Sequence, residues 1–267
     1  MPMPPSSGGT IPDDPVARLS PRMVRFFNGV MRRQMRRAFR AVRVLRAGRP
    51  DVPADRPVVV YGNHPGWWDP AFFIVLQETL FPGRQGYGPM EATALERYPF
   101  MKRIGIFGVD PESRAGGVRF LRIGTHLLDD PSRTLWMTVQ GRFADPRERP
   151  VTLRPGLAHL MARVPGAMAL PVALEYPFWS EKRPEALAAF GLPLVDVGSA
   201  AAWQGALEVG LTATQDRLAA AAMARDPAAF ETILGGARGV GGVYGLWSRL
   251  RDTAAGRGHD PDHVAGE

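Results

Sequence analysis

Residues 58–69 read VVVYGNHPGWWD, an apolar run that stops abruptly at an asparagine and a histidine and has an aspartate five residues after the histidine. A continuous apolar run of this length, ended by turn residues, predicts a strand that is covered on both faces of a sheet. Asp69-Pro70 then predicts the start of a helix that runs to about Leu80. We therefore expect a strand, a sharp turn and a helix, with the histidine just past the strand and the aspartate in the first helical turn.

The same alternation of strand and helix continues along the chain. Apolar runs predict strands at 57–62, 104–109, 134–139 and 168–175. Apolar residues spaced three to four apart predict helices at 69–80, 113–128, 155–164 and 205–225. This order is typical of a single α/β domain, here over 51–235, with a mostly parallel central sheet flanked by helices. In such sheets, sites form at the carboxyl ends of the strands.

Composition excludes several classes of chemistry. The chain has 267 residues, of which 45% are apolar, so it can build a sizeable core. It contains no cysteine, which excludes disulfides, thiolate nucleophiles and cysteine metal sites. His259, Asp260, Asp262 and His263 lie in a polar tail without further ligand clusters, so we expect no metal and no other cofactor.

The two ends of the chain have the composition of tails. Residues 1–20 mix Pro, Gly and Ser, without the basic and apolar regions of a secretory signal, and predict a disordered tail. Residues 236–267 predict a Gly-rich connector and a C-terminal tail. No window approaches the 18 or more apolar residues of a spanning helix, so we expect no transmembrane segment.

The positive charge is concentrated in one segment. Residues 21–50 contain ten Arg and no acidic residue, and removing them from the net charge of +7 leaves 7 − 10 = −3. Their apolar residues recur at helical spacing and predict one basic amphipathic helix. It fits a membrane-surface helix, a nucleic-acid-binding helix or a helix packed on the core. The pattern favours an anionic membrane surface, alone or with core packing at one end, and the chain lacks any nucleic-acid-binding signature.

His64 and Asp69 are the candidate catalytic residues. A carboxylate that accepts a hydrogen bond from one imidazole nitrogen leaves the other nitrogen free to take a proton from a hydroxyl. No serine or cysteine nucleophile lies beside them, so the hydroxyl would belong to the substrate. The alternative is that Asp69 only caps a helix and His64 is an ordinary loop residue.

Four segments resemble the glycerolipid acyltransferase family, which includes the lysophosphatidate and other lysophospholipid acyltransferases. NHPGWWD (63–69) resembles the Asn-His-x4-Asp motif of that family. The second, third and fourth family blocks are resembled by GIFGVDPESR (105–114), TVQGRFADPRERPVTLRPG (138–156) and ALPVALEY (169–176). Together the four blocks cover about 60–180.

The resemblance implies a reaction and roles for particular residues. His64 would be the general base and Asp69 its orienting carboxylate. A lyso-lipid hydroxyl would attack an acyl thioester of coenzyme A or acyl carrier protein directly, without an acyl-enzyme. The residues implied in substrate binding are Asn63, Arg114, Gln140, Gly141 and Arg142. The enzyme would work as a peripheral protein at the cytoplasmic face of the membrane.

Two departures from the family pattern concern the acceptor. The second block usually has arginine directly after its aspartate, whereas Pro111 stands there and Arg114 follows three residues later. In the third block Gln140 replaces the family's glutamate. The acceptor is therefore open between a lysophospholipid such as lysophosphatidate and a non-phosphate aminolipid or glycolipid. A non-catalytic membrane-binding protein with a vestigial site is the alternative from another class.

Overall fold

The computed structural model describes residues 11–236, and its sheet has eight strands in the order β4-β3-β5-β2-β6-β7-β1-β8. The strands are β1 Ala41–Leu45, β2 Val58–Gly62, β3 Gln85–Glu91, β4 Ile106–Val109, β5 Arg133–Thr138, β6 Met168–Glu175, β7 Ala186–Phe190 and β8 Phe230–Gly235. Neighbours from β4 to β6 are parallel, β7 is antiparallel to β6, β1 is parallel to β7, and β8 is antiparallel to β1. The predicted α/β domain with a mostly parallel sheet is confirmed.

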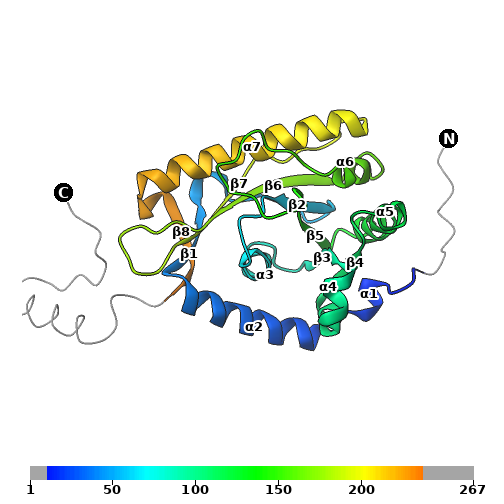
Figure 1. Ribbon diagram of the computed structural model, residues 1–267, viewed down its shortest axis with the longest axis horizontal. Helices are drawn as coiled ribbons and strands as arrows, with labels where there is room; N and C mark the ends of the chain where they lie inside the picture. Colours follow the sequence, from blue (N-terminus) through cyan, green and yellow to red (C-terminus); the bar gives the residue numbers. More distant parts are fainter. Residues whose placement is uncertain (1–10, 237–267) are drawn as a thin grey trace, which may run out of the picture.

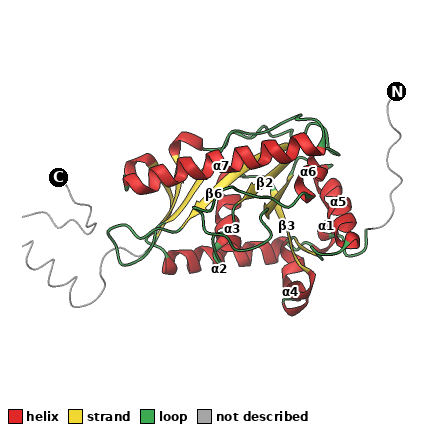
Figure 2. Cartoon of the chain, turned by 45° about the horizontal axis from the view of Figure 1, so that its top comes forward, coloured by secondary structure: helices red, strands yellow, loops and turns green. Residues whose placement is uncertain are grey.

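Helices cover both faces of this sheet (Figures 1 and 2). They are α1 Pro15–Arg18, α2 Pro21–Ala38, α3 Asp69–Leu80, α4 Ala92–Arg97, α5 Arg114–Leu128, α6 Gly156–Met161 and α7 Ala200–Ala224, with short 3-10 turns η1 Arg46–Gly48, η2 Pro99–Ile104 and η3 Pro227–Ala229. In β2, Val58 and Val60 face the core under α2 and α3, whereas Val59 and Tyr61 face the core under α5, α6 and α7. This two-sided burial explains the continuous apolar run.

The sheet register places three loops together. β2 lies between β5 and β6 and runs parallel to both, with Gly62 opposite Thr138 on one side and Val172 on the other. The carboxyl ends of these three strands therefore meet at one edge of the sheet. The loops that follow them carry the candidate site.

The basic helix is shorter than predicted. It ends at Ala38, and Ala41–Leu45 forms β1 between β7 and β8 instead of continuing the helix to residue 50. The valines of this stretch satisfy strand spacing as well as helical spacing, and burial between two neighbouring strands decides between them. Arg43 is accommodated because its guanidinium pairs with Glu185 at 2.9 Å. The α/β domain therefore begins before residue 51.

Part of the predicted N-terminal tail is folded. The Asp14 side chain accepts the Val16 N–H at 2.9 Å and so caps α1. Val16 and Leu19 pack against the core, and the Ser20 N–H donates to the Arg103 carbonyl at 2.8 Å. The prediction of a disordered tail is thus wrong for 11–20, and 1–10 lie outside the described residues. The predicted C-terminal connector and tail lie there too, except Gly236.

Candidate active site

His64 and Asp69 form a hydrogen-bonded pair at the carboxyl end of β2. The His64 Nδ1 and an Asp69 carboxylate oxygen, Oδ2, are 2.5 Å apart. Asp69 is the first residue of α3 and is completely buried, and the Gly66 N–H donates to the same oxygen at 3.2 Å. The turn between strand and helix thus brings together the two side chains singled out in the sequence.

The carboxylate fixes the imidazole tautomer. An ionised carboxylate can only accept hydrogen bonds, so the proton shared with Asp69 resides on Nδ1 of His64. The other ring nitrogen, Nε2, has no hydrogen-bond partner in the part of the chain that the structure describes, and the side chain is 21% exposed. In the neutral imidazole Nε2 is therefore the acceptor nitrogen, and it is open to a ligand, as a general base requires.

Tyr176 is a third member of this group. It directly follows β6, and its hydroxyl donates to the other Asp69 oxygen, Oδ1, at 2.5 Å. The ring packs beside Phe39 and Phe72. Burial, and then the negative charge of Asp69, raise the pKa of Tyr176 well above its usual value, so the hydroxyl stays a donor. Sequence reasoning gave Tyr176 no role, although its place after the parallel neighbour of β2 was a signal.

Asn63 ties the turn after β2 to strand β6. Its side-chain amide donates to the Leu174 carbonyl at 3.0 Å and accepts the Leu174 N–H at 2.8 Å, which ties the end of β2 to β6. Asn63 is completely buried. The structure therefore gives it a positioning role and not the direct substrate contact that the resemblance implied.

The loop after β5 holds the backbone of His64. The Gln140 side-chain oxygen accepts the His64 N–H at 3.1 Å, and the His64 carbonyl accepts the Ala144 N–H at 3.0 Å. Phe143 lies against the imidazole, with ring centroids 4.4 Å apart, although Phe143 itself is 60% exposed. Gln140 thus holds the backbone of the base, and Phe143 packs against its imidazole ring.

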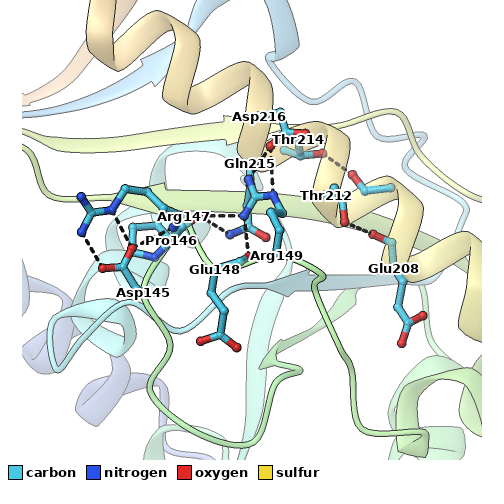
Figure 3. Close-up of polar contacts among 11 residues, drawn as sticks. Asp145, Pro146, Arg147, Glu148, Arg149, Glu208, Thr212, Thr214, Gln215 and Asp216 are labelled. Atoms are coloured by element: carbon cyan, nitrogen blue, oxygen red, sulfur yellow. Dashed lines mark hydrogen bonds and ion pairs between the residues drawn. The ribbon is translucent and has the colours of Figure 1, made fainter.

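α7 anchors the far part of this loop (Figure 3). The Arg149 Nε donates to Asp216 at 3.0 Å, and the Gln215 amide donates to the Pro146 carbonyl at 2.9 Å. Within the loop, Arg147 donates to both oxygens of Asp145, and this hydrogen bonding lowers the pKa of that carboxyl. The position of the segment over His64 therefore depends on contacts with a distant helix.

Gly141, Arg142 and Arg154 form the basic side of the site. Gly141 has a φ of +71°, and the Arg154 side chain occupies the space that a β-carbon would need there. Arg142 pairs with Glu148, and Arg154 donates to Glu112 at 2.7 Å. Arg154 was not chosen as a site residue from the sequence.

Arg114 is not brought to the site. It is the exposed first residue of α5, and it does not line the cavity next to His64. Gly116, Gly117, Phe120 and Leu121 are the residues of that helix that line the cavity, whereas the Arg114 side chain at its start is exposed to solvent. The arginines of the third block that do line the cavity are Arg142 and Arg154.

A large apolar cavity opens beside His64. Its volume is about 1020 Å³, at the upper end for small-molecule sites. Its walls include apolar side chains from three helices and the neighbouring strands, among them Phe27, Met31, Phe73, Ile74, Leu121 and Met137. His64, Arg142 and Arg154 line the same cavity. The site therefore combines a histidine held by a carboxylate, nearby guanidinium groups and a long apolar wall.

α2 separates this cavity from solvent. Val24, Phe27 and Met31 line the cavity, and Met35 is packed in the core. The apolar stripe of the helix therefore faces the cavity and the core, and the solvent-exposed side of the helix is a different face. The outer face is basic and carries exposed Arg22, Arg25, Arg33, Arg36 and Arg37, together with Phe26. These five arginines have no ion pair within residues 11–236.

No protein-family model matches the chain, and a search of curated proteins gives no significant match. Within the described residues, no group of three or more His, Asp or Glu side chains is arranged to hold a metal ion. None of the helices in that range combines the length and the apolarity needed to cross a bilayer. The case for a function therefore rests on the geometry of the site and on the motif resemblance.

Proposed function

We propose that the protein is an acyltransferase that moves a fatty acyl group from an acyl thioester to the hydroxyl of a lipid acceptor. One observation carries the proposal. His64 is held by Asp69 through Nδ1, and its unpartnered Nε2 belongs to a side chain that lines a large apolar cavity. A fixed imidazole with its acceptor nitrogen beside space for an acyl chain is the arrangement that direct acyl transfer to a hydroxyl needs.

The reaction uses His64 twice. Nε2 accepts the proton of the acceptor hydroxyl while the hydroxyl oxygen attacks the thioester carbonyl carbon. The carbon–sulfur bond then breaks, and the imidazolium returns the proton to the departing thiolate. Asp69 stabilises the imidazolium between these two steps. The products are an ester and a free thiol, and no side chain of the protein is acylated.

The donor is a thioester of coenzyme A or acyl carrier protein, as the family resemblance implies. The apolar walls offer its chain, or a chain of the acceptor, an environment that excludes water. Phe143 covers one side of the imidazole and helps to keep water from the base. This arrangement supports transfer to a bound hydroxyl over hydrolysis of the thioester.

The outer face of α2 supports an anionic membrane as the source of the acceptor. Exposed Arg33, Arg36 and Arg37 can bind acidic headgroups, and exposed Phe26 can enter the interface. The same helix lines the cavity with its inner face. A bilayer bound to α2 would therefore lie next to the space that receives the lipid.

Two ion pairs favour a second acceptor class. Arg142 pairs with Glu148 and Arg154 pairs with Glu112, so both of these guanidinium groups already have a carboxylate partner. A phosphate would have to displace these carboxylates, whereas a neutral or amino-bearing headgroup would not. This observation supports an aminolipid or glycolipid acceptor beside the lysophospholipid.

The test is thiol release from long-chain acyl-coenzyme A and acyl carrier protein thioesters in vesicles that contain one acceptor at a time. The panel includes lysophosphatidate, a zwitterionic lysophospholipid, a lyso-aminolipid and a glycolipid. We expect release that depends on one acceptor and yields its acylated product. Replacing His64 with alanine should lower the rate about 100- to 10,000-fold, because the base is lost.

His126→Ala is the matched control, since His126 lies on α5, faces Asp14 and does not line the cavity. It should keep the wild-type rate. Acceptor-dependent transfer at the wild-type rate by folded His64→Ala protein would refute the assignment of the base. Absence of transfer with every donor and acceptor, while vesicle binding persists, would favour the non-catalytic alternative.

A further inference from the structure

We infer that Tyr176 is a positioning residue for the proposed base, acting through Asp69. Its hydroxyl holds Oδ1 of the carboxylate so that Oδ2 is directed at Nδ1 of His64. The role of the pair rests on the proposed function, but the arrangement itself can be measured without any reaction.

The contacts of Asp69 form a closed set. Tyr176 donates to Oδ1 at 2.5 Å, whereas Gly66 and His64 engage Oδ2 at 3.2 and 2.5 Å. The carboxylate is completely buried and needs donors to offset the loss of its hydration. The tyrosine hydroxyl is the donor to Oδ1 in the described chain, so it decides whether the carboxylate keeps one orientation.

The hydroxyl has no separate packing role. The ring of Tyr176 packs beside Phe39 and Phe72, and phenylalanine would make the same ring contacts. Removing the hydroxyl alone therefore isolates the hydrogen bond to Asp69. Without it, the negative charge of the carboxylate is less dispersed and holds the imidazolium of His64 more strongly.

The inference predicts two changes in Tyr176→Phe. The acidic limb of the pH–rate profile should move to higher pH, because the base stays protonated longer. The kcat should fall about tenfold, as expected when one hydrogen bond to a charged group is lost, while the KM for the thioester is unchanged. If the substitution only disturbed packing, it would change neither the acidic limb of the pH–rate profile nor the relative size of the changes in kcat and KM.

Tyr61→Phe is the matched control. Tyr61 is fully buried, and its hydroxyl donates to the Leu207 carbonyl at 3.2 Å, away from the pair. It also loses a buried hydroxyl bond, but it leaves Asp69 unchanged. Its pH–rate profile should match the wild type.

The second measurement is the proton resonance of His64 Nδ1–H in ¹⁵N-labelled protein, recorded without substrate. We expect this resonance to move in Tyr176→Phe and to stay in place in Tyr61→Phe. An unmoved resonance in folded Tyr176→Phe protein would overturn the inference, whatever the activity. Absence of acyl transfer by the wild type would instead refute the proposed function, and a moved resonance would still support the positioning role.

Discussion

Polar side chains are hydrogen-bonded within the protein around His64, whereas on the outer face of α2 they are left exposed. Around His64, the side chains of Asn63, Asp69, Gln140 and Tyr176 are each hydrogen-bonded to a specified atom of the turn or of β6. On α2, five exposed arginines have no ion pair within the described chain. One region uses polar groups to fix geometry, and the other leaves charge available to a partner.

The two regions should therefore respond to different perturbations. Short hydrogen bonds between buried groups are little affected by salt and are disrupted by the loss of one atom. Exposed charges act over a Debye length of about 8–10 Å at ordinary salt, so many of them contribute together and ionic strength weakens them. If both regions serve one reaction, catalysis and membrane binding can be separated by mutation.

The largest separable effect is expected on the basic face. Replacing Arg33, Arg36 and Arg37 with glutamine should weaken binding to anionic vesicles about 100-fold, at roughly 1 kcal/mol for each arginine. Binding should be measured by vesicle sedimentation over a series of salt concentrations, because the wild-type affinity should fall with salt more steeply than that of the variant. Thiol release with a soluble short-chain donor and acceptor should be unchanged.

A control for net charge replaces three exposed basic residues elsewhere, Arg114, Arg163 and Lys182, with glutamine. This variant has the same net charge as the first but keeps the basic face. It should retain most of its vesicle binding. Equal losses in the two variants would show that overall charge, and not the face of α2, attracts the bilayer.

A smaller effect is expected at Gln140. Replacement by leucine removes the oxygen that accepts the His64 N–H and should lower kcat about tenfold, the cost of leaving a part-buried donor unpaired. Replacement by glutamate, the residue of the family block, keeps an acceptor oxygen and should stay within about threefold of the wild type. Steady-state kinetics of both variants would test the pair. Equal rates for leucine and glutamate would exclude the hydrogen bond as the function of Gln140.

The sequence predicted the parts of the fold that are marked by continuous apolar runs. The central strand β2 and helix α3 were found because buried parallel strands are uniformly apolar and Asp-Pro marks a helix start. β3, QGYGPME, has no such run, and β7, ALAAF, is rich in a helix-forming residue. Their pairing with neighbouring strands forms them, which a local pattern does not record.

The same limit applies to the site. His64 and Asp69 are five residues apart, so a local motif was enough to identify them. Tyr176 reaches Asp69 across 107 positions, and Arg154 reaches Glu112 across 42. Arg114 was chosen by its place after the second block, but the start of α5 turns it to solvent. Such roles depend on sheet register and helix direction, which only the folded chain defines.

The smallest effect is expected at Glu175, the last residue of β6 and the neighbour of Tyr176. Its ionised carboxylate is destabilised by its surroundings. Burial raises the pKa of its carboxyl, and Arg149 and Arg147 offset this only in part. A carboxyl whose pKa is higher in the folded protein than in the unfolded chain favours folding while it is protonated, and this stability is lost as pH rises through the folded pKa.

Glu175→Gln mimics the protonated form and should raise the melting temperature at pH 7 by about one to two degrees, with no difference at pH 4. Scanning calorimetry at both pH values would measure this difference. Glu96→Gln, at an exposed glutamate of α4, should change the melting temperature at neither pH. A lower melting temperature for Glu175→Gln at pH 7 would mean that Arg147 and Arg149 stabilise the carboxylate by more than burial destabilises it. The charged form of Glu175 would then be stabilised by its arginine neighbours, as the polar groups around His64 are stabilised by their hydrogen-bond partners.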